Sequence, residues 1–294
     1  SNVIYDRENS AIAVTPSSAY EWDRIFDGAS WFHISGITPA LSKNAADSSL
    51  NAVRKAKERN LTVSCDLNFR KKLWKWDKNM KPRELAEKTM REILPYTDLV
   101  IANEEDASDV LGIHAEGSDA SSGKLDTSRY PEVAEKISAQ FPNVSKVAIT
   151  LRESISATHN NWGAMLYEKS SGKSFFAPLK NGAYSPYEIR DIVDRVGGGE
   201  SFAAGLIFAL MDKELAKAEK AIAFAENDKI NNLAMSGKLD NSEYQANQRA
   251  FVAKNDELIR QAANKRGLSV LPPVTKAGDF KPGTDTDRQL ASNK

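Results

Sequence analysis

Between residues 31 and 151, short apolar segments alternate with helical patterns, and this alternation constrains the fold more than any other feature. The segments with strand character span residues 31–35, 61–67, 98–102 and 146–151. Strands joined by amphipathic helices imply right-handed crossovers and a parallel sheet with helices on both faces. We therefore predict an α/β fold, a three-layer α/β/α sandwich in which these four strands are parallel neighbours.

The connecting segments carry helix and turn signals. Over residues 42–59, apolar side chains recur on one face and Lys and Arg residues on the other. Pro82 marks the start of a second helix, which we expect to end near Leu94. We also expect a helix over residues 130–140, a hairpin around residues 165–176, and one or two short strands within residues 3–14.

Polar side chains follow three of the predicted strands, where an open α/β sheet usually places its binding site. After residue 102, the segment Asn103 to Asp106 is also typical of a helix start, with acids in the first turn. Arg70 could equally be a surface residue beside two lysines. The three groups are Asp66, Asn68 and Arg70; Asn103, Glu104, Glu105 and Asp106; and Arg152 and Glu153.

A triple glycine, Gly197, Gly198 and Gly199, precedes an almost wholly apolar run from Phe202 to Met211, after a strand-like stretch over residues 187–193. The run has the length of a buried helix. Bare backbone N–H groups at the positive end of a helix dipole can hold a phosphate or an oxyanion. Glu200 would place a carboxylate beside such a site. The alternative is a tight connection followed by an acid that caps the helix.

Composition narrows the range of functions. Lys and Arg number 40 and Asp and Glu number 40, so we expect neither a nucleic-acid surface nor an electrostatic membrane anchor. One cysteine, Cys65, allows no intramolecular disulfide, and the three histidines show no metal-ligand spacing. The sequence shows no signal-peptide pattern at its start, so we expect a cytoplasmic protein.

The composition changes near Leu215, where a charged, alanine-rich helical pattern begins. A second helical pattern follows a break at residues 236–241, and together they predict an antiparallel helical hairpin over residues 213–270. Pro272-Pro273 ends this pattern, and residues 271–294 have the composition of a flexible tail. The α/β core is therefore expected over residues 1–212.

Five stretches, in order along the chain, resemble the ribokinase-like, PfkB-type carbohydrate kinases, and among them most closely the 2-keto-3-deoxygluconate kinases. The resemblance runs from Val3 to about Leu210. The stretches are Tyr5-Asp6-Arg7, Asp66-Leu67-Asn68-Phe69-Arg70 with Leu73-Trp74, Ala102-Asn103-Glu104-Glu105-Asp106-Ala107, Thr150-Leu151-Arg152-Glu153-Ser154, and Asp194-Arg195-Val196-Gly197-Gly198-Gly199-Glu200-Ser201-Phe202.

The resemblance implies transfer of the γ-phosphoryl group of ATP, with Mg²⁺, to the 6-hydroxyl of a keto-deoxy sugar acid. It implies the following roles. Tyr5, Arg7 and Arg70 would hold the sugar acid; Gly197, Gly198 and Gly199 would form the anion hole; Glu200 would be the base; Asn103 and Asp106 would organise Mg²⁺ and phosphate; and Thr150 and Arg152 would line the nucleotide. The partners would be the sugar acid and ATP, with a homo-oligomer compatible with the family.

The sequence departs from the family pattern in several ways. The family has aspartate where Glu200 stands and glutamate where Asp106 stands. Its opening strand, its substrate-binding Gly-Asp segment and most of its lid have no counterpart before Val3. Two hypotheses therefore stay open, a slow sugar-acid kinase and a kinase-derived module that binds or assembles without catalysis. The retained Arg7, Arg70 and glycines favour the first, and the exchanged base favours the second.

Overall fold

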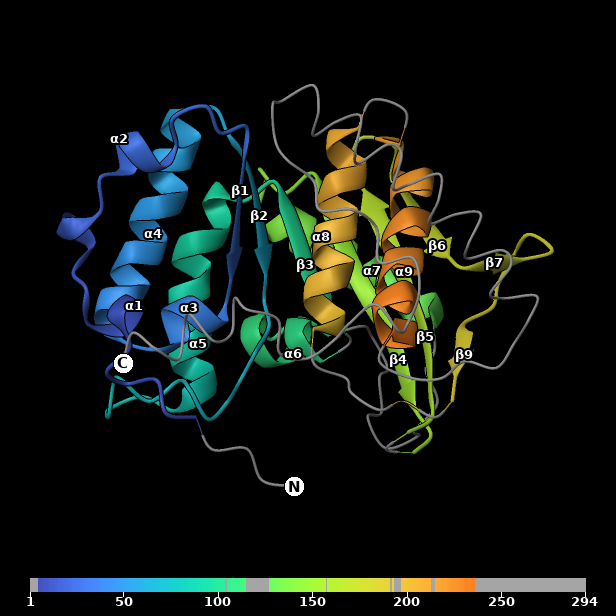
Figure 1. Cartoon of the computed structure of the whole chain (residues 1–294), viewed down its shortest axis with the longest axis horizontal. Coiled ribbons are helices and arrows are strands. Elements are labelled where there is room, and N and C mark those ends of the chain that lie inside the picture. The colour runs from blue at the N-terminus through green and yellow to red at the C-terminus, as the bar shows by residue number, and fades with distance from the viewer. Residues whose placement is uncertain are drawn as a thin grey trace, which may run out of the picture. The chain divides into compact units, whose positions relative to one another are not determined.

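The computed structural model describes residues 5–103, 105–114, 127–156, 158–190, 192, 197–212 and 215–235. Within them, a seven-stranded sheet lies at the centre of the fold (Figure 1). Six strands lie in the order β1-β2-β3-β4-β5-β6, and β9 pairs with the first residues of β5. The strands are β1 (Trp31–Ser35), β2 (Thr62–Asp66), β3 (Leu99–Asn103), β4 (Lys146–Ser154), β5 (Asn160–Glu168), β6 (Lys173–Ala177) and β9 (Tyr187–Ile189), with a separate ribbon of β7 (Leu179–Lys180) and β8 (Ala183–Tyr184).

The first four strands are parallel neighbours, which confirms the prediction. Cys65 of β2 lies opposite Ile34 on one side and Val100 on the other, and Val100 lies opposite Val147. β4 then turns back into antiparallel β5, which pairs with β6 as the predicted hairpin. The carboxyl ends of β1 to β4 therefore share one edge of the sheet.

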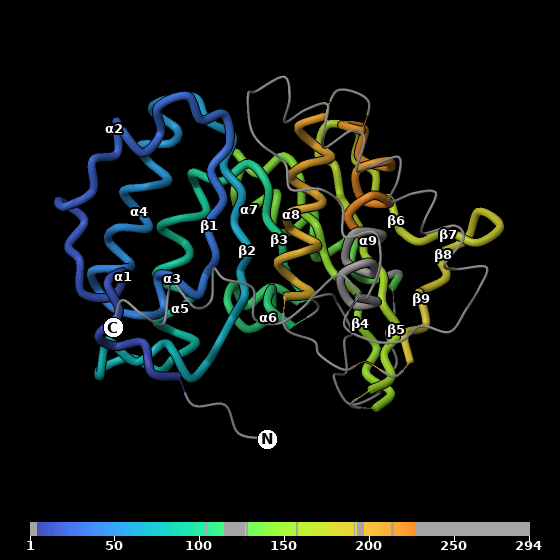
Figure 2. Tube along the Cα trace, viewed as in Figure 1, coloured from blue at the N-terminus to red at the C-terminus, as the bar shows by residue number. Residues whose placement is uncertain are grey.

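Helices cover both faces of the sheet. The parallel strands follow one another in chain order, so right-handed crossovers place their connecting helices on one face. Figure 2 shows β1, β2 and β3 between α4 and α5 on one side and α8 on the other. The longer helices are α4 (Lys43–Glu58), α5 (Pro82–Ile93), α7 (Tyr130–Gln140), α8 (Gly198–Met211) and α9 (Ala218–Met235), and the short ones are α1 (Ala11–Val14), α2 (Trp22–Ile25), α3 (Ile37–Ala40) and α6 (Asp106–Leu111), with 3-10 turns at Ser17–Ala19, Leu94–Tyr96 and Thr127–Arg129.

One continuous apolar core joins the sheet to the helices of the first face. Leu85 and Met90 of α5 and Ile137 of α7 are buried in it together with Val63 and Cys65 of β2. Burial of this apolar surface is the main force that holds the layers together. The ends of β2 and β3 are therefore rigidly placed.

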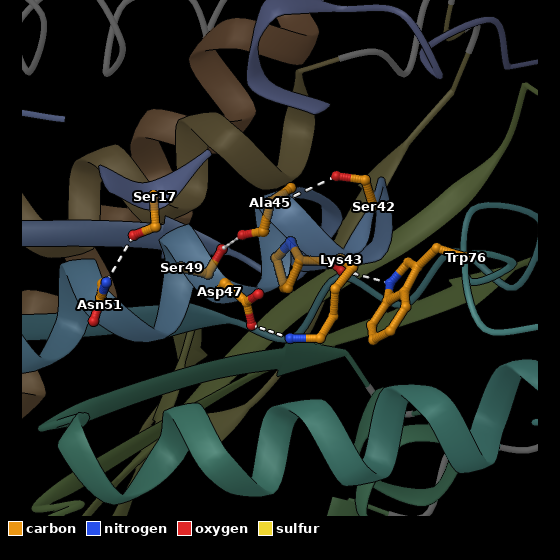
Figure 3. A network of polar contacts seen from close by, with 9 residues as sticks. Ser17, Ser42, Lys43, Ala45, Asp47, Ser49, Asn51 and Trp76 are labelled. Carbon is orange, nitrogen blue, oxygen red and sulfur yellow. Dashed lines mark hydrogen bonds and ion pairs between the residues drawn. The ribbon is translucent and has the colours of Figure 1, made fainter. Parts of the chain in front are cut away.

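Of the strands predicted within residues 3–14, the part at Ala11–Val14 is wrong, because these residues form the helix α1, and the part at residues 3 and 4 lies outside the described residues. Alanine is a strong helix former, so the alternation of Ala11 and Ala13 carried little strand preference. Ser42 accepts a hydrogen bond from the Ala45 N–H over 3.0 Å and so caps α4, and its hydroxyl donates to the Ala13 carbonyl over 2.6 Å. Asn51 further along α4 donates to Ser17 over 2.8 Å (Figure 3). The segment before β1 is thereby tied to α4.

The helix α9 packs along α8 and over β5 and β6. Phe208 of α8 stacks on Phe224 of α9, with ring centroids 5.4 Å apart. This helix is the first of the hairpin expected over residues 213–270; the second helix and the tail over residues 271–294 lie outside the described residues. In the described part of the chain, every helix is too short or too polar to cross a lipid bilayer.

Candidate active site

The loops that follow β1, β2 and β3 are tied together at the carboxyl edge of the sheet. Asp66 is the last residue of β2, and the backbone turns sharply after it because Asn68 has a φ of 36°. The Asn68 N–H donates to Asp66 Oδ1 over 3.2 Å, and its side-chain amide donates to Ser35 Oγ at the end of β1 over 3.2 Å. This geometry turns the segment that contains Asp66, Asn68 and Arg70 along the sheet edge.

The side chains of Asn103 and Asp106 accept hydrogen bonds from backbone amides. Asn103 Oδ1 accepts from the N–H groups of Glu105 and Asp106, both over 2.8 Å. Asp106 Oδ2 accepts from the Asn103 N–H over 3.3 Å, and Asp106 Oδ1 accepts from the Phe69 N–H over 3.1 Å. The local bonds agree with the alternative in which this stretch starts a helix, and the bond to Phe69 adds a link to the loop after β2.

Asp106 is a buried carboxyl group and Asp66 a half-buried one, and the pKa of each is raised. Burial first, then the charges of Asp106 and Glu200, raise the pKa of Asp66 to about 7 against the opposing effects of the Asn68 N–H and the Arg70 guanidinium. Burial also raises the pKa of Asp106, against the hydrogen bonds from Asn103 and Phe69 and the charge of Arg70. A carboxyl group with a pKa near neutrality is typical of functional sites. The same couplings place Arg70 and Glu200 within electrostatic reach of the acid pair.

Arg70 and Glu200 are the solvent-exposed members of this group. Arg70 Nη1 donates to the carbonyl of Phe69 over 3.0 Å, and the residue is exposed to solvent. Glu200 lies in the first turn of α8. Because Glu200 affects the pKa of Asp66, α8 begins at the same end of the sheet as the acid pair. A ligand bound there could meet a guanidinium and a carboxylate together.

The glycine turn forms the start of α8. Gly197 is the N-cap with a φ of 85°, a left-handed conformation that favours glycine, and its carbonyl accepts the Ser201 N–H over 2.9 Å. A Cβ atom on Gly199 would meet nothing within 4 Å, so packing does not require glycine there. The N–H groups of a first helical turn have no intrahelical partner. The turn therefore presents the start of a helix with open space in front of Gly199, which the predicted anion site requires.

Thr150 and Arg152 lie on β4, two residues apart. Thr150 Oγ1 is 3.5 Å from the Ala102 carbonyl, and the Arg152 guanidinium lies 5.6 Å from the Trp162 ring centroid. Arg152 and Glu153 were expected after the strand, but β4 continues to Ser154 because it pairs with β5 up to that residue. Arg152 and Glu153 are therefore strand residues and do not lie in a loop.

Tyr5 and Arg7 form a separate contact. The Arg7 guanidinium lies 5.9 Å from the Tyr5 ring centroid, and Tyr5 packs against the apolar core. Two guanidinium groups form no bond to each other, so the convergence of Arg7 and Arg70 on one substrate carboxylate stays a prediction. The structure thus brings Arg70, Asp106 and Glu200 together and records Tyr5 and Arg7 as a pair of their own.

Two contributors at this edge, Ser35 and Gly36, were not singled out in the sequence. The Ser35 hydroxyl accepts from Asn68, and the Gly36 N–H donates to the Asp66 carbonyl over 2.8 Å. A small hydroxyl residue and a glycine directly after a predicted strand were the available signal. That signal is weak, because the same pair closes many strands without function.

Comparison with known proteins agrees with this geometry. Residues 1–227 match the family described as pfkB family carbohydrate kinase. The chain belongs to the pfkB family of carbohydrate kinases. The match includes every strand of the sheet and the glycine turn.

Individual pfkB relatives share the fold and part of the sequence. The 2-dehydro-3-deoxygluconokinase of Thermotoga maritima is 40% identical, with a TM-score of 0.67, and the match covers 79% of this chain and 62% of that one. A PfkB family carbohydrate kinase from Listeria grayi is 26% identical, with a TM-score of 0.65, over 81% of this chain and 65% of that one. The 2-dehydro-3-deoxygalactonokinase of Haloferax volcanii is 26% identical over 76% of this chain and 57% of its own. The chain spans less than two thirds of each relative.

The pfkB family implies Mg²⁺, and the side chains at this edge offer few ligands for that ion. Among the described residues, no group of three or more His, Cys, Asp or Glu side chains is placed to hold a metal. Both oxygens of Asp106 already accept backbone N–H groups. Mg²⁺ in kinases is commonly held by one or two carboxylates together with substrate phosphates and water. Of the acid pair, Asp66 therefore fits such a partial role better than Asp106, and the described residues form no complete protein cage.

Proposed function

We propose that the chain is an ATP-dependent sugar-acid kinase that phosphorylates the 6-hydroxyl of 2-keto-3-deoxygluconate or a similar sugar acid. One observation carries the proposal: at the carboxyl edge of the parallel sheet, Asp106 accepts the Phe69 N–H and Arg70 donates to the Phe69 carbonyl, with Glu200 near enough to raise the pKa of Asp66. Such an edge is where open α/β sheets bind ligands. The names of the Thermotoga and Haloferax relatives support a keto-deoxy sugar acid as substrate.

In this proposal each part of the site has one task. Arg70, with Tyr5 and Arg7, holds the substrate carboxylate, since a guanidinium pairs well with that group. Glu200 accepts the proton of the 6-hydroxyl as its oxygen attacks the γ-phosphorus and the bond to the bridging oxygen of ADP breaks. The N–H groups of Gly197, Gly198 and Gly199 face the charge of the transferred group.

The nucleotide would lie between the acid pair and β4. Asn103 stands at the end of β3, and Thr150 and Arg152 stand on β4 beside it, so all three would line the bound ATP. Mg²⁺ would neutralise phosphate charge when it binds with ATP. The protein residues orient the two substrates and exclude water from the transfer.

A second candidate function is a binding or assembly module without catalysis. Glu200 favours this module, because the family has aspartate at this position. The glutamate side chain is one methylene longer, so its oxygens lie about 1 Å from where those of aspartate would be. A misplacement of that size can lower the rate on the order of 10²-fold. This module would keep the sugar-acid contact of Arg70 and lose the proton transfer.

The test is a coupled assay of ADP release by the full chain with ATP, Mg²⁺ and 2-keto-3-deoxygluconate. We expect ADP release that depends on the sugar acid and is absent with a neutral sugar of the same carbon number. Calorimetric titration with each ligand separates the two candidates. Sugar-acid binding without turnover supports the module, and binding of neither ligand contradicts both.

A further inference from the structure

We propose that Asp106 is a positioning residue that fixes Arg70 for the sugar-acid carboxylate by holding the backbone of Phe69. The loop concerned, residues 67–70, is called the arginine loop below. The inference rests on the proposed function for the role of Arg70. It assigns to Asp106 a task different from organising Mg²⁺ and phosphate.

After β2 ends, the backbone N–H groups of successive residues stop bonding to the neighbouring strand and bond to side-chain oxygens instead. The Leu67 N–H donates to the Ile101 carbonyl of β3 over 2.9 Å, which is the continuation of the sheet. The Asn68 N–H donates to Asp66 Oδ1, and the Phe69 N–H donates to Asp106 Oδ1 over 3.1 Å. Asp106 thus takes over from β3 as the hydrogen-bond acceptor for the backbone of the arginine loop. A buried amide that loses its acceptor is costly, which makes this bond important.

Asp106 is itself held in place. It is 4% exposed, its own N–H donates to Asn103 Oδ1 over 2.8 Å, and its Oδ2 accepts the Asn103 N–H over 3.3 Å. Its two carboxylate oxygens therefore bind two different segments, the end of β3 and the arginine loop. Because the Asp106 side chain is bonded to both segments, it can hold the arginine loop at a fixed position relative to the end of β3.

The bond to Phe69 bears directly on Arg70. Asp106 binds the N–H of Phe69, and Arg70 Nη1 donates to the carbonyl of the same residue over 3.0 Å. The left-handed φ of Asn68 leaves the loop few ways to relax around this point. Release of the Phe69 N–H would let its carbonyl move, and the guanidinium bound to that carbonyl would move with it.

The variant that tests this is Asp106→Asn. Asparagine has the same shape but offers one oxygen acceptor and an NH₂ donor, so it can satisfy only one of the two amides. The matched control is Asp109→Asn, one turn along α6, where the half-buried carboxylate pairs with the exposed Arg83 over 2.5 Å. Because Arg83 is 65% exposed, solvent screens this pair and its contribution to stability is small.

The test combines two measurements on the full chain, hydrogen exchange and ligand affinity. Residue-resolved hydrogen exchange should show the Phe69 amide exchanging at least about tenfold faster in Asp106→Asn and unchanged in Asp109→Asn. The dissociation constant for 2-keto-3-deoxygluconate should rise about tenfold in Asp106→Asn, while that for ATP changes less than about twofold.

Several results would overturn the inference. Unchanged exchange at Phe69 would mean that Asp106 does not hold the loop, and an equal loss of ATP affinity would mean that it serves the nucleotide or the fold at large. If the wild-type chain binds no sugar acid, the proposed function fails, and the exchange measurement still decides whether Asp106 holds the loop. If Asp106→Asn shows no cooperative melt, Asp106→Ser, whose shorter side chain cannot reach both amides, should give the same two changes.

Discussion

A Cβ atom on Gly36 would lie 2.1 Å from the carbonyl oxygen of Leu67 and 3.0 Å from its carbonyl carbon. The loops after β1 and β2 therefore touch backbone to backbone, and the Gly36 N–H donates to the Asp66 carbonyl across the same contact. Only glycine allows this approach. The position of Asp66 and of the arginine loop depends on it.

Replacement of this glycine should destabilise the fold. Gly36→Ala forces two backbones apart and should lower the free energy of unfolding by about 1–3 kcal/mol. Urea denaturation measures the loss. Gly199→Ala is the matched control, because a methyl group there meets nothing within 4 Å. Equal denaturation midpoints for the two variants would contradict the close contact between Gly36 and Leu67.

Gly199→Ala also tests the anion site at the start of α8. The helix should gain up to about 1 kcal/mol from the removal of glycine, since packing leaves room for the methyl group. Phosphoryl transfer should fall, because the methyl group fills the space where the phosphate approaches the backbone. We expect a stable variant with a raised ATP Michaelis constant or a lower turnover. A variant with wild-type turnover would show that the turn is only a connection.

The raised pKa of Asp66 predicts a pH-dependent stability. In the folded protein Asp66 binds a proton up to a pH of about 7, whereas in the unfolded chain it does so only below its ordinary pKa of 3.8. Between these values the folded state holds the extra proton, so the free energy of unfolding falls as the pH rises, by up to about 1.4 kcal/mol per pH unit. The contribution of Asp66 is fully present below the lower value and lost above the higher one.

The variant Asp66→Asn should remove this dependence while keeping an acceptor for the Asn68 N–H. Thermal melts at about pH 5 and about pH 8 would compare the two proteins. We expect the melting temperature of the wild type to fall more over this interval than that of Asp66→Asn. Parallel behaviour would mean that Asp66 is ionised in the folded protein at both pH values.

Arg70 should matter for one substrate only. Arg70→Ala removes a charge-assisted contact worth roughly 1.5–3 kcal/mol, so the dissociation constant for the sugar acid should rise about tenfold or more. ATP affinity should stay unchanged. The neighbouring exposed Lys71 offers the control Lys71→Ala, which should alter neither. Equal losses for both ligands in Arg70→Ala would assign Arg70 to the fold.

Glu200 should limit the rate and not the affinity. Glu200→Asp brings the carboxylate closer to the helix mouth and should raise turnover, on the order of 10²-fold if the full misplacement is corrected. Both ligand affinities should stay nearly constant, because the backbone N–H groups of the glycine turn are unchanged. Steady-state kinetics check this. If Glu200→Ala were as active as the wild type, Glu200 would be a helix cap and no base.

The sequence was most informative where local patterns decide the structure. The parallel strands and α7 follow the predicted ranges, because apolar periodicity and start signals such as Pro82 act over a few residues. The helix Ala11–Val14 was missed because a run of small residues carries no clear period. The end of β4 was missed because pairing with β5 extends it past Leu151.

The sequence was sufficient to predict which residues belong to the site, but not which hydrogen bonds join them. Arg70 and Glu200 could be singled out from the motifs that contain them. The bond from Phe69 to Asp106 joins residues 37 apart, so no local pattern reveals it. The same is true of Gly36, whose need for a bare backbone arises only when Leu67 lies against it.

The thiol of Cys65 can be used to measure how often the sheet opens next to the site. Cys65 is the single cysteine of the chain, it is fully buried in β2, and its backbone is directly joined to Asp66. Burial raises the pKa of its thiol, so the reactive thiolate forms only when the sheet opens. The rate at which an aromatic disulfide reagent labels the native chain therefore measures the opening of the strand beside the site, and a ligand that stabilises that strand should slow the labelling.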